Sequence, residues 1–261
     1  MEPEISNQSL LFLTVFVFIP LSLSYFYQLG LSRNILWSSI RGTLQLFAIG
    51  YLLTYLFDLQ AGIGIPLMIS IMIMVAAFHA RLKGRELPNV FWYILAGLVV
   101  IEVSVLSMWL LFDMVEFTPS EVIPMSGMVI GNSMIAMGLA LERMKNEFKE
   151  NNGRLLAALS LGAKPNSASK LIVQKTLNAA LIPNVDQLKT IGLVQLPGMM
   201  TGLILGGVEP VMAIKYQLVI SLSIFSSVSL SAMFITLSMY RYFFNEQAQL
   251  LETEEEIRNQ T

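Results

Sequence analysis

One carboxylic acid stands in the middle of an apolar stretch. Glu102 is flanked by LVVI and VSVL, in a segment long enough to cross a bilayer. An ionisable side chain at that depth is costly, so it usually faces the interior of a helix bundle, where it binds a cation or carries a proton. The alternative is a protonated, structural acid that is bonded to a polar neighbour, for which Asn132 and Gln195 are the candidates.

Two glycine-rich apolar stretches carry the other groups that could line a path through a membrane. In the second, QLPGMM at 195–200, a proline at membrane depth frees backbone groups that neighbouring helices or water must satisfy. Both stretches also repeat glycines four residues apart, which is typical of close helix packing and gives these residues a structural alternative. The candidate path residues are Glu102, Asn132, Gln195, Pro197, Gly198, Met199 and Met200.

The chain lacks the residues on which most enzymes depend. It has no cysteine, and its only histidine, His79, lies at the end of an apolar stretch, so neither a HExxH site nor a triad with a spare ligand is available. The chain contains no GxxxxGK[ST] loop, the motif that binds the phosphates of ATP in many ATPases. The 16 methionines are softer ligands than iron prefers and more often fill helix interfaces, so any metal ligands stay unknown. We expect no enzyme and no cofactor here.

Composition predicts the elements that must position these residues. Hydrophobic residues make up 55% of the chain and charged residues 13%, and no basic patch suggests a nucleic-acid partner. A helix needs about 20 apolar residues to cross the lipid core. The predicted fold is therefore an all-α, polytopic integral membrane protein surrounded by lipid, one domain over 1–261 with about seven spans near 9–29, 40–57, 62–80, 91–113, 120–141, 188–208 and 213–240.

Positive charges predict how these spans are oriented. Loops rich in Lys and Arg stay in the cytoplasm, and of the 16 such residues only Lys215 falls on the other side in this arrangement. The N-terminus is therefore expected outside and the C-terminus inside. The alternative is six spans with a re-entrant segment near 120–135.

The longest polar stretch, 142–187, is expected in the cytoplasm. Gly162 suits the end of one helix, and Pro165 suits the first turn of the next. The stretch therefore predicts a helix, a sharp turn and an amphipathic helix. A pair of helices lying on anionic lipid is the structural alternative.

The turn itself carries a motif. LGAKPNSA fits LGAxPxxA, which resembles the cytoplasmic coupling loop of ABC-transporter permeases, the membrane subunits that dock onto a separate ATPase. Small residues there let a partner's backbone approach closely. On this resemblance the coupling residues are Leu161, Gly162, Ala163, Pro165 and Ala168.

The whole chain resembles the FetB-type permease family of bacteria, which includes an iron export permease and has plant relatives that are aluminium-sensitivity transporters. VIPMSGMVIGNSM at 122–134, LSLGAKPNSAS at 159–169 and the long block 181–217 carry this resemblance. It implies a homodimeric permease of the bacterial inner (cell) membrane, paired with an ABC ATPase that binds ATP and Mg, exporting iron in metal homeostasis.

Two further expectations stay open at this point. Asp186 and Lys189 are three residues apart and are expected to pair near the cytoplasmic boundary, either as a structural ion pair or in transmitting ATPase motion. The competing function is an ion-coupled secondary transporter or channel that uses Glu102.

Overall fold

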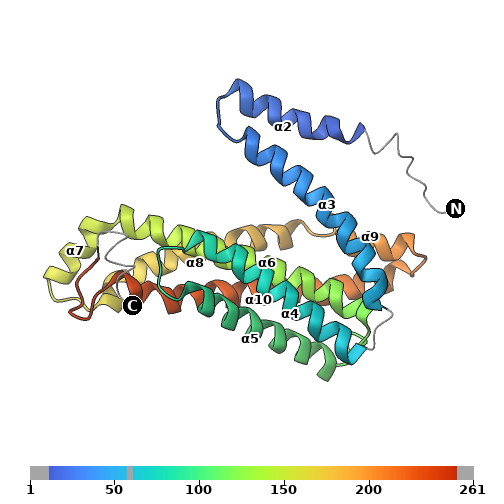
Figure 1. The fold of residues 1–261 in the computed structure, drawn as a ribbon. Coiled ribbons are helices and arrows are strands. Elements are labelled where there is room, and N and C mark those ends of the chain that lie inside the picture. Colours follow the sequence, from blue (N-terminus) through green and yellow to red (C-terminus); the bar gives the residue numbers. More distant parts are fainter. Residues whose placement is uncertain (1–11, 58–60, 252–261) are drawn as a thin grey trace. The chain divides into compact units, whose positions relative to one another are not determined.

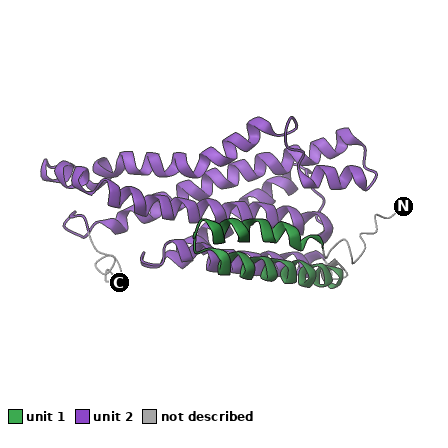
Figure 2. Ribbon diagram, turned by 90° about the horizontal axis from the view of Figure 1, so that it is seen from above, with its two compact units in different colours: residues 1–60 green, residues 61–261 purple. Residues whose placement is uncertain are grey.

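The computed structural model describes residues 12–57 and 61–251, and these residues form helices without a β-strand. They divide into two compact units, residues 1–60 and residues 61–261 (Figures 1 and 2). The all-α prediction is confirmed for the described part of the chain. The two units are described separately below.

The first unit is a helical hairpin. α2 (Thr14–Phe26) packs on α3 (Ser32–Phe57), and the Ser32 hydroxyl donates a hydrogen bond to Ser24 Oγ at 3.0 Å across the turn. Part of the predicted span 9–29 lies outside the described residues, and the described α2 is shorter than a full crossing. α3 begins well before the predicted residue 40, because polar residues at 32–39 still continue the helix.

The second unit is a bundle in which α6 (Pro119–Glu150) and α10 (Pro210–Met239) pack along each other at the centre. α4 (Ala61–Ala80), followed by the 3-10 turn η1 (Arg81–Lys83), packs on α6, and α5 (Val90–Leu111) packs on α4, α6 and α10. α7 (Asn152–Ser160), α8 (Pro165–Thr190) and α9 (Gly198–Leu205) follow, and η2 (Tyr240–Phe243) ends the bundle.

Proline sets where three of these helices begin. α6, α8 and α10 each have Pro at the first helical position, preceded by a residue whose ψ lies between 134° and 151°. The proline ring excludes the helical conformation from the residue before it but fits the first turn, where no intrahelical partner needs its missing N–H. The same rule therefore defines the start of each long helix in the second half of the chain.

Four helices are long and apolar enough to cross a membrane, namely Ala61–Lys83, Val90–Leu111, Pro119–Glu150 and Pro210–Phe243. They match the predicted spans 62–80, 91–113, 120–141 and 213–240. α6 runs unbroken through 120–135, so the re-entrant alternative is wrong at that place. The total of seven spans and the orientation stay predictions.

The predicted span 188–208 is not one helix. α8 ends at Thr190, and α9 begins only at Gly198. Gly192 has a φ of +79°, and its N–H donates a hydrogen bond to the Gln195 carbonyl at 2.9 Å, which closes a tight turn. A left-handed residue and the following Pro197 both interrupt a helix. α8 also continues past residue 187, where the sequence predicts the end of the cytoplasmic stretch. Because α6, α7 and α8 together cover most of 142–187, that stretch is mostly helix.

Among the described glycines, the most tightly surrounded is Gly97, which the repeated glycines of the sequence did not predict. A Cβ on Gly97 of α5 would lie 2.7 Å from the Phe234 ring of α10 and 2.8 Å from Met137 Cε of α6. By contrast, a Cβ on Gly131, Gly198 or Gly202 would meet nothing within 4 Å. α5, α6 and α10 therefore come close together around Gly97. Of the glycine step in α6, Gly127 faces α4, since a Cβ there would lie 3.5 Å from Met72 Sδ, whereas Gly131 and the two glycines of α9 face no other part of the described chain.

Candidate functional site

The turn between α7 and α8 stands exposed at the charged end of the bundle. Leu161 is 89% exposed, and Gly162 has a φ of +88°, which a residue with a side chain rarely adopts. The Gly162 and Ala163 N–H groups donate to the Leu159 and Ala158 carbonyls at 2.9 and 3.0 Å, so the end of α7 is closed by its own backbone. α8 then starts at Pro165. The helix, turn and helix that the sequence predicts are confirmed.

The turn is fixed at its base but not covered at its tip. α7 buries a single residue, Leu155, and packs on α8. The first turn of α8 is tied by Ser169 Oγ, which donates to the Pro165 carbonyl at 2.7 Å. Ala168 is half-buried beside it. The predicted residues Leu161, Gly162, Ala163, Pro165 and Ala168 thus form one short, rigid projection.

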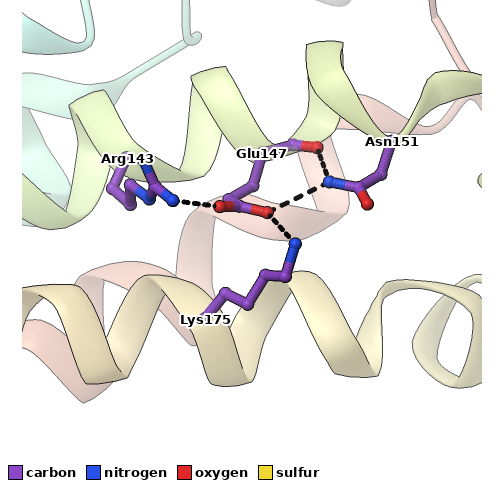
Figure 3. A network of polar contacts seen from close by, with 4 residues as sticks. All are labelled: Arg143, Glu147, Asn151 and Lys175. Atoms are coloured by element: carbon purple, nitrogen blue, oxygen red, sulfur yellow. Dashed lines mark hydrogen bonds and ion pairs between the residues drawn. The ribbon is translucent and has the colours of Figure 1, made fainter.

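Beneath this projection, a buried carboxylate joins α6 to α8 (Figure 3). Glu147 of α6 is fully buried, and Lys175 of α8 donates a hydrogen bond to its Oε2 at 2.9 Å. Arg143, one turn earlier in α6, forms an ion pair with Glu147 Oε1 at 2.6 Å. Asn151 Nδ2, one turn later, donates to Oε2 at 3.0 Å and to the Glu147 carbonyl at 2.8 Å. We call these four residues the α6–α8 joint.

The joint lies beyond the apolar part of α6, in its charged last turns. Burial raises the pKa of the Glu147 carboxyl, but the hydrogen bond and charge of Lys175 and the charge of Arg143 outweigh it and hold the pKa below its ordinary value. Glu147 is therefore an ionised group. Two hydrogen-bond donors, Lys175 of α8 and Asn151 at the end of α6, and the ion pair with Arg143 hold its carboxylate, which makes the spacing of α6 and α8 at this end specific.

Aromatic and ionic contacts tie the same end of α6 to two more segments. The ring of Phe148 stacks on that of Phe243 in η2, with centroids 4.0 Å apart and planes at 4°. Lys83 of η1 pairs with Glu142 at 2.6 Å, and Lys145 pairs with Glu86. The connection that follows α4, the charged end of α6 and the segment that follows α10 therefore meet at one end of the second unit (Figure 1).

Sequence reasoning missed Glu147 and Arg143. The available signal was the spacing of Arg143, Glu147 and Asn151, each four residues from the next, which puts a base, an acid and an amide on one helix face. That pattern could not predict that Glu147 is buried, because alternating charges along a helix are usually solvated. Lys175 gave no signal either, since its partner lies 28 residues away in sequence.

The candidate path residues do not form a single cluster. Glu102 is 1% exposed in α5, and neither carboxylate oxygen has a hydrogen-bond partner among the described residues, although Ser126 of α6 lies beside it. Asn132 donates instead to the Met128 carbonyl of its own helix at 2.8 Å. Gln195 is exposed in the turn before α9. The alternative of a structural acid bonded to Asn132 or Gln195 is therefore wrong.

The segment from Pro197 to Met200 attaches α9 to α10. Pro197 is the residue before the first turn of α9, and the Met200 N–H donates to Gln217 Oε1 at 3.3 Å. Gln217 Nε2 in turn donates to Ser221 Oγ at 2.8 Å. Gly198 is exposed, while Met199 and Met200 are half-buried. In the part of the chain that the structure describes, no cluster of three His, Cys, Asp or Glu side chains suits a metal ion.

The predicted pair of Asp186 and Lys189 is formed. Lys189 Nζ lies 2.9 Å from Asp186 Oδ1 near the end of α8, and the Lys189 and Asp186 side chains are 68% and 61% exposed. Thr190 Oγ1 approaches the carbonyls of Asp186 and Gln187 at 3.3 and 3.2 Å.

Comparisons with known proteins agree with the membrane fold. A model of the family described as "Uncharacterised protein family (UPF0014)" matches residues 7–244. The Probable iron export permease protein FetB of Escherichia coli (strain K12) is 36% identical over 251 residues, 96% of this chain and 97% of the relative. UPF0014 membrane protein YjkA of Bacillus subtilis (strain 168) is 34% identical over 92% of this chain and 96% of its own length.

A plant relative matches over a similar range. Protein ALUMINUM SENSITIVE 3 of Arabidopsis thaliana is 33% identical, covering 90% of this chain and 86% of the relative. No solved structure matches the chain.

Proposed function

The chain belongs to the UPF0014 family and is a multi-pass membrane permease, and from this premise we propose that it is the permease subunit of an ABC exporter. A separate ATPase, which binds ATP and Mg, supplies the energy. Two copies of this chain form the transport unit in a bacterial inner membrane. This arrangement accounts for a permease chain that carries no phosphate-binding loop of its own.

The exposed turn at Leu161 and Gly162 carries the proposal. The Leu161 side chain is 89% exposed and stands on a backbone that is closed by its own hydrogen bonds. It is therefore a well-defined apolar knob at the tip of the projection, which could fill a groove on a partner. A movement of that knob would reach the membrane through the α6–α8 joint, because Lys175 lies on the helix that the turn begins and Glu147 lies on the central helix of the bundle. The connection is short and ionic, so the projection and the spans move together.

The proposed cargo is a metal ion, with iron first. The support is the printed name of the Escherichia coli relative, an iron export permease, together with the plant relative named for aluminium sensitivity. Glu102 is the buried acid that a cation would meet inside the bundle. Cellular iron content in cells that lack or overproduce the chain and its ATPase tests the cargo. An unchanged iron content in both would argue against iron.

Docking is tested by substituting the knob. Leu161→Asp puts a charge at the centre of the proposed contact, and we expect the amount of ATPase that co-purifies with the chain to fall about tenfold or more. Leu82→Asp is the matched control, because Leu82 is also exposed at the charged end, on η1. Equal ATPase recovery with Leu161→Asp and the unchanged chain would refute docking at this turn.

A second candidate function rests on Glu102. Its unpartnered, buried carboxyl group suits an ion-coupled secondary transporter or channel, which needs no ATPase. Transport by the purified chain alone in liposomes, driven by an ion gradient and lost in Glu102→Gln, would support this function. Transport that needs both ATP and the ATPase, and that Glu102→Gln leaves intact, would exclude it.

A further inference from the structure

α8 is the polar helix of the second unit. Among the long helices in the described part of that unit, it is the only one without the hydropathy of a span, although it packs along both α6 and α10. Its buried face consists of Ser169, Ile172, Thr176 and Ala180, and beyond Ala180 it has no buried residue. Its last turns therefore leave the protein interior while still carrying Asp186, Lys189 and Thr190 on one exposed face.

The α6–α8 joint fixes the depth of that face. α8 runs back along α6 from the contact of Lys175 with Glu147 (Figures 1 and 3). From Lys175 to Thr190 the helix advances about 22 Å, whereas the apolar part of α6 begins about 9 Å from Glu147, at Leu141. For helices that run side by side, Thr190 thus reaches about the level of Asn132 of α6, about 13 Å beyond Leu141. At this level the pair would lie deeper in the membrane than the boundary position that the sequence predicts.

Lipid does not suit this face. Charged side chains at membrane depth face protein or a water-filled cavity, and Asp186 and Lys189 are more than half exposed in this chain. Pro183 adds to the polarity, because a proline inside a helix leaves a carbonyl of the preceding turn without its donor. Non-helical backbone such as 191–197 is likewise tolerated at this depth only where it is buried in protein or lines a cavity.

We propose that the face of α8 formed by Asp186, Lys189 and Thr190 lines a water-filled path for the cation cargo. This inference rests on the proposed transport function and adds the residues that the cargo passes. Asp186 is the cation contact, and in the empty path Lys189 occupies its carboxylate at 2.9 Å. An arriving cation exchanges with the ammonium group, so no net charge is left exposed in the path before or after it passes.

The natural absence of cysteine makes a direct test possible. Three single-cysteine variants of the full chain are compared in membrane vesicles. Thr190→Cys keeps the ion pair and probes the proposed path, Val103→Cys probes an exposed apolar position near the middle of α5, and Asn166→Cys probes the exposed start of α8. Each is treated with a small charged thiol reagent and, separately, with a bulky polyethylene-glycol maleimide.

The three positions have different expected outcomes. Thr190→Cys should react with the small reagent and not with the bulky one, Val103→Cys with neither, and Asn166→Cys with both. If Thr190→Cys fails to react with the small reagent, the face is covered by lipid or protein and the proposal is wrong. If it reacts with the bulky reagent, the pair lies in open water and the proposal is wrong as well. Neither result depends on ATPase docking.

The charges are tested in the same background. In Thr190→Cys, adding Lys189→Gln leaves Asp186 without its counter-charge, so a positively charged reagent should gain on a negatively charged one. Adding Asp186→Asn instead leaves Lys189 without its counter-charge. The rate of reaction with the negatively charged reagent should then rise relative to the rate with the positively charged one. A ratio that stays the same in both double variants would show that the pair does not set the potential in the path.

Discussion

Glu147 and Glu102 are both buried in the second unit, and their surroundings are opposite. Glu147 accepts hydrogen bonds from Lys175 and Asn151 and forms an ion pair with Arg143. By contrast, neither oxygen of Glu102 has a hydrogen-bond partner in the described chain. A buried carboxylate that is fully paired fixes a structure. One without donors is costly as a free ion, so it needs a proton or a bound cation. The comparison separates a joint from a candidate transport residue.

Glu147→Ala should give the largest effect. It leaves Lys175 and Arg143 without their shared carboxylate. Their side chains are 44% and 42% exposed and can be hydrated, so the loss of these charged contacts should cost about 1.5–3 kcal/mol of stability. Unfolding of the purified chain in detergent measures this loss. Glu142→Ala is the control, because its pair with Lys83 is about half exposed and such pairs contribute at most about 1 kcal/mol. Equal losses in the two variants would contradict the distinction between them.

The pH dependence of stability sharpens the same point. Because the pKa of Glu147 is lower in the folded chain than its ordinary value of 4.5, its contribution is present above that value and is lost as the pH falls below it. Unfolding measured between neutral pH and pH below 4.5 should therefore show a smaller loss on acidification in Glu147→Gln than in the unchanged chain. Parallel curves would mean that Glu147 is not held ionised by its partners.

Glu102→Leu should act in the opposite direction. Replacing an unpartnered buried polar group by an apolar one of similar size removes a desolvation cost, so stability should stay the same or rise by about 1 kcal/mol. Unfolding in detergent measures the change, and Glu102→Gln serves as the polar control. A loss as large as that of Glu147→Ala would show that Glu102 has structural partners.

The sequence predicted the architecture well where hydropathy was decisive. The apolar stretches at 62–80, 91–113, 120–141 and 213–240 became α4, α5, α6 and α10, because a run of that length and composition has few other stable forms in lipid. It also predicted the turn at Gly162 and Pro165, since both residues act on their own backbone. These are local rules, which one sequence suffices to apply.

The rest depends on contacts that are distant in sequence. α8 is too polar to be recognised as part of the bundle, and its course became clear only from its packing on α6 and α10. The partnership of Glu147 with Lys175 and the isolation of Glu102 likewise follow from which helix faces meet. Their polarity within apolar stretches made Asn132 and Gln195 possible partners of Glu102. In the structure, however, Asn132 bonds to its own helix and Gln195 is exposed.

Lys189→Gln should have the smallest effect on stability. The pair with Asp186 is mostly exposed, and exposed pairs contribute about 0.2–1 kcal/mol. Unfolding in detergent should therefore hardly change, while transport should fall if the pair contacts the cargo. Gln187→Ala, a neighbouring exposed position, is the control. A clear loss of stability without loss of transport would assign the pair to the structure alone.

Metal-ion transport in liposomes that contain the chain with and without the proposed ABC ATPase is the most direct test of the proposed transport cycle. We expect Fe²⁺ to move only when both chains and ATP are present, and Leu161→Asp to abolish this movement while Leu82→Asp does not. Transport by the chain alone under an ion gradient, with no response to ATP or to Leu161→Asp, would contradict the proposed cycle.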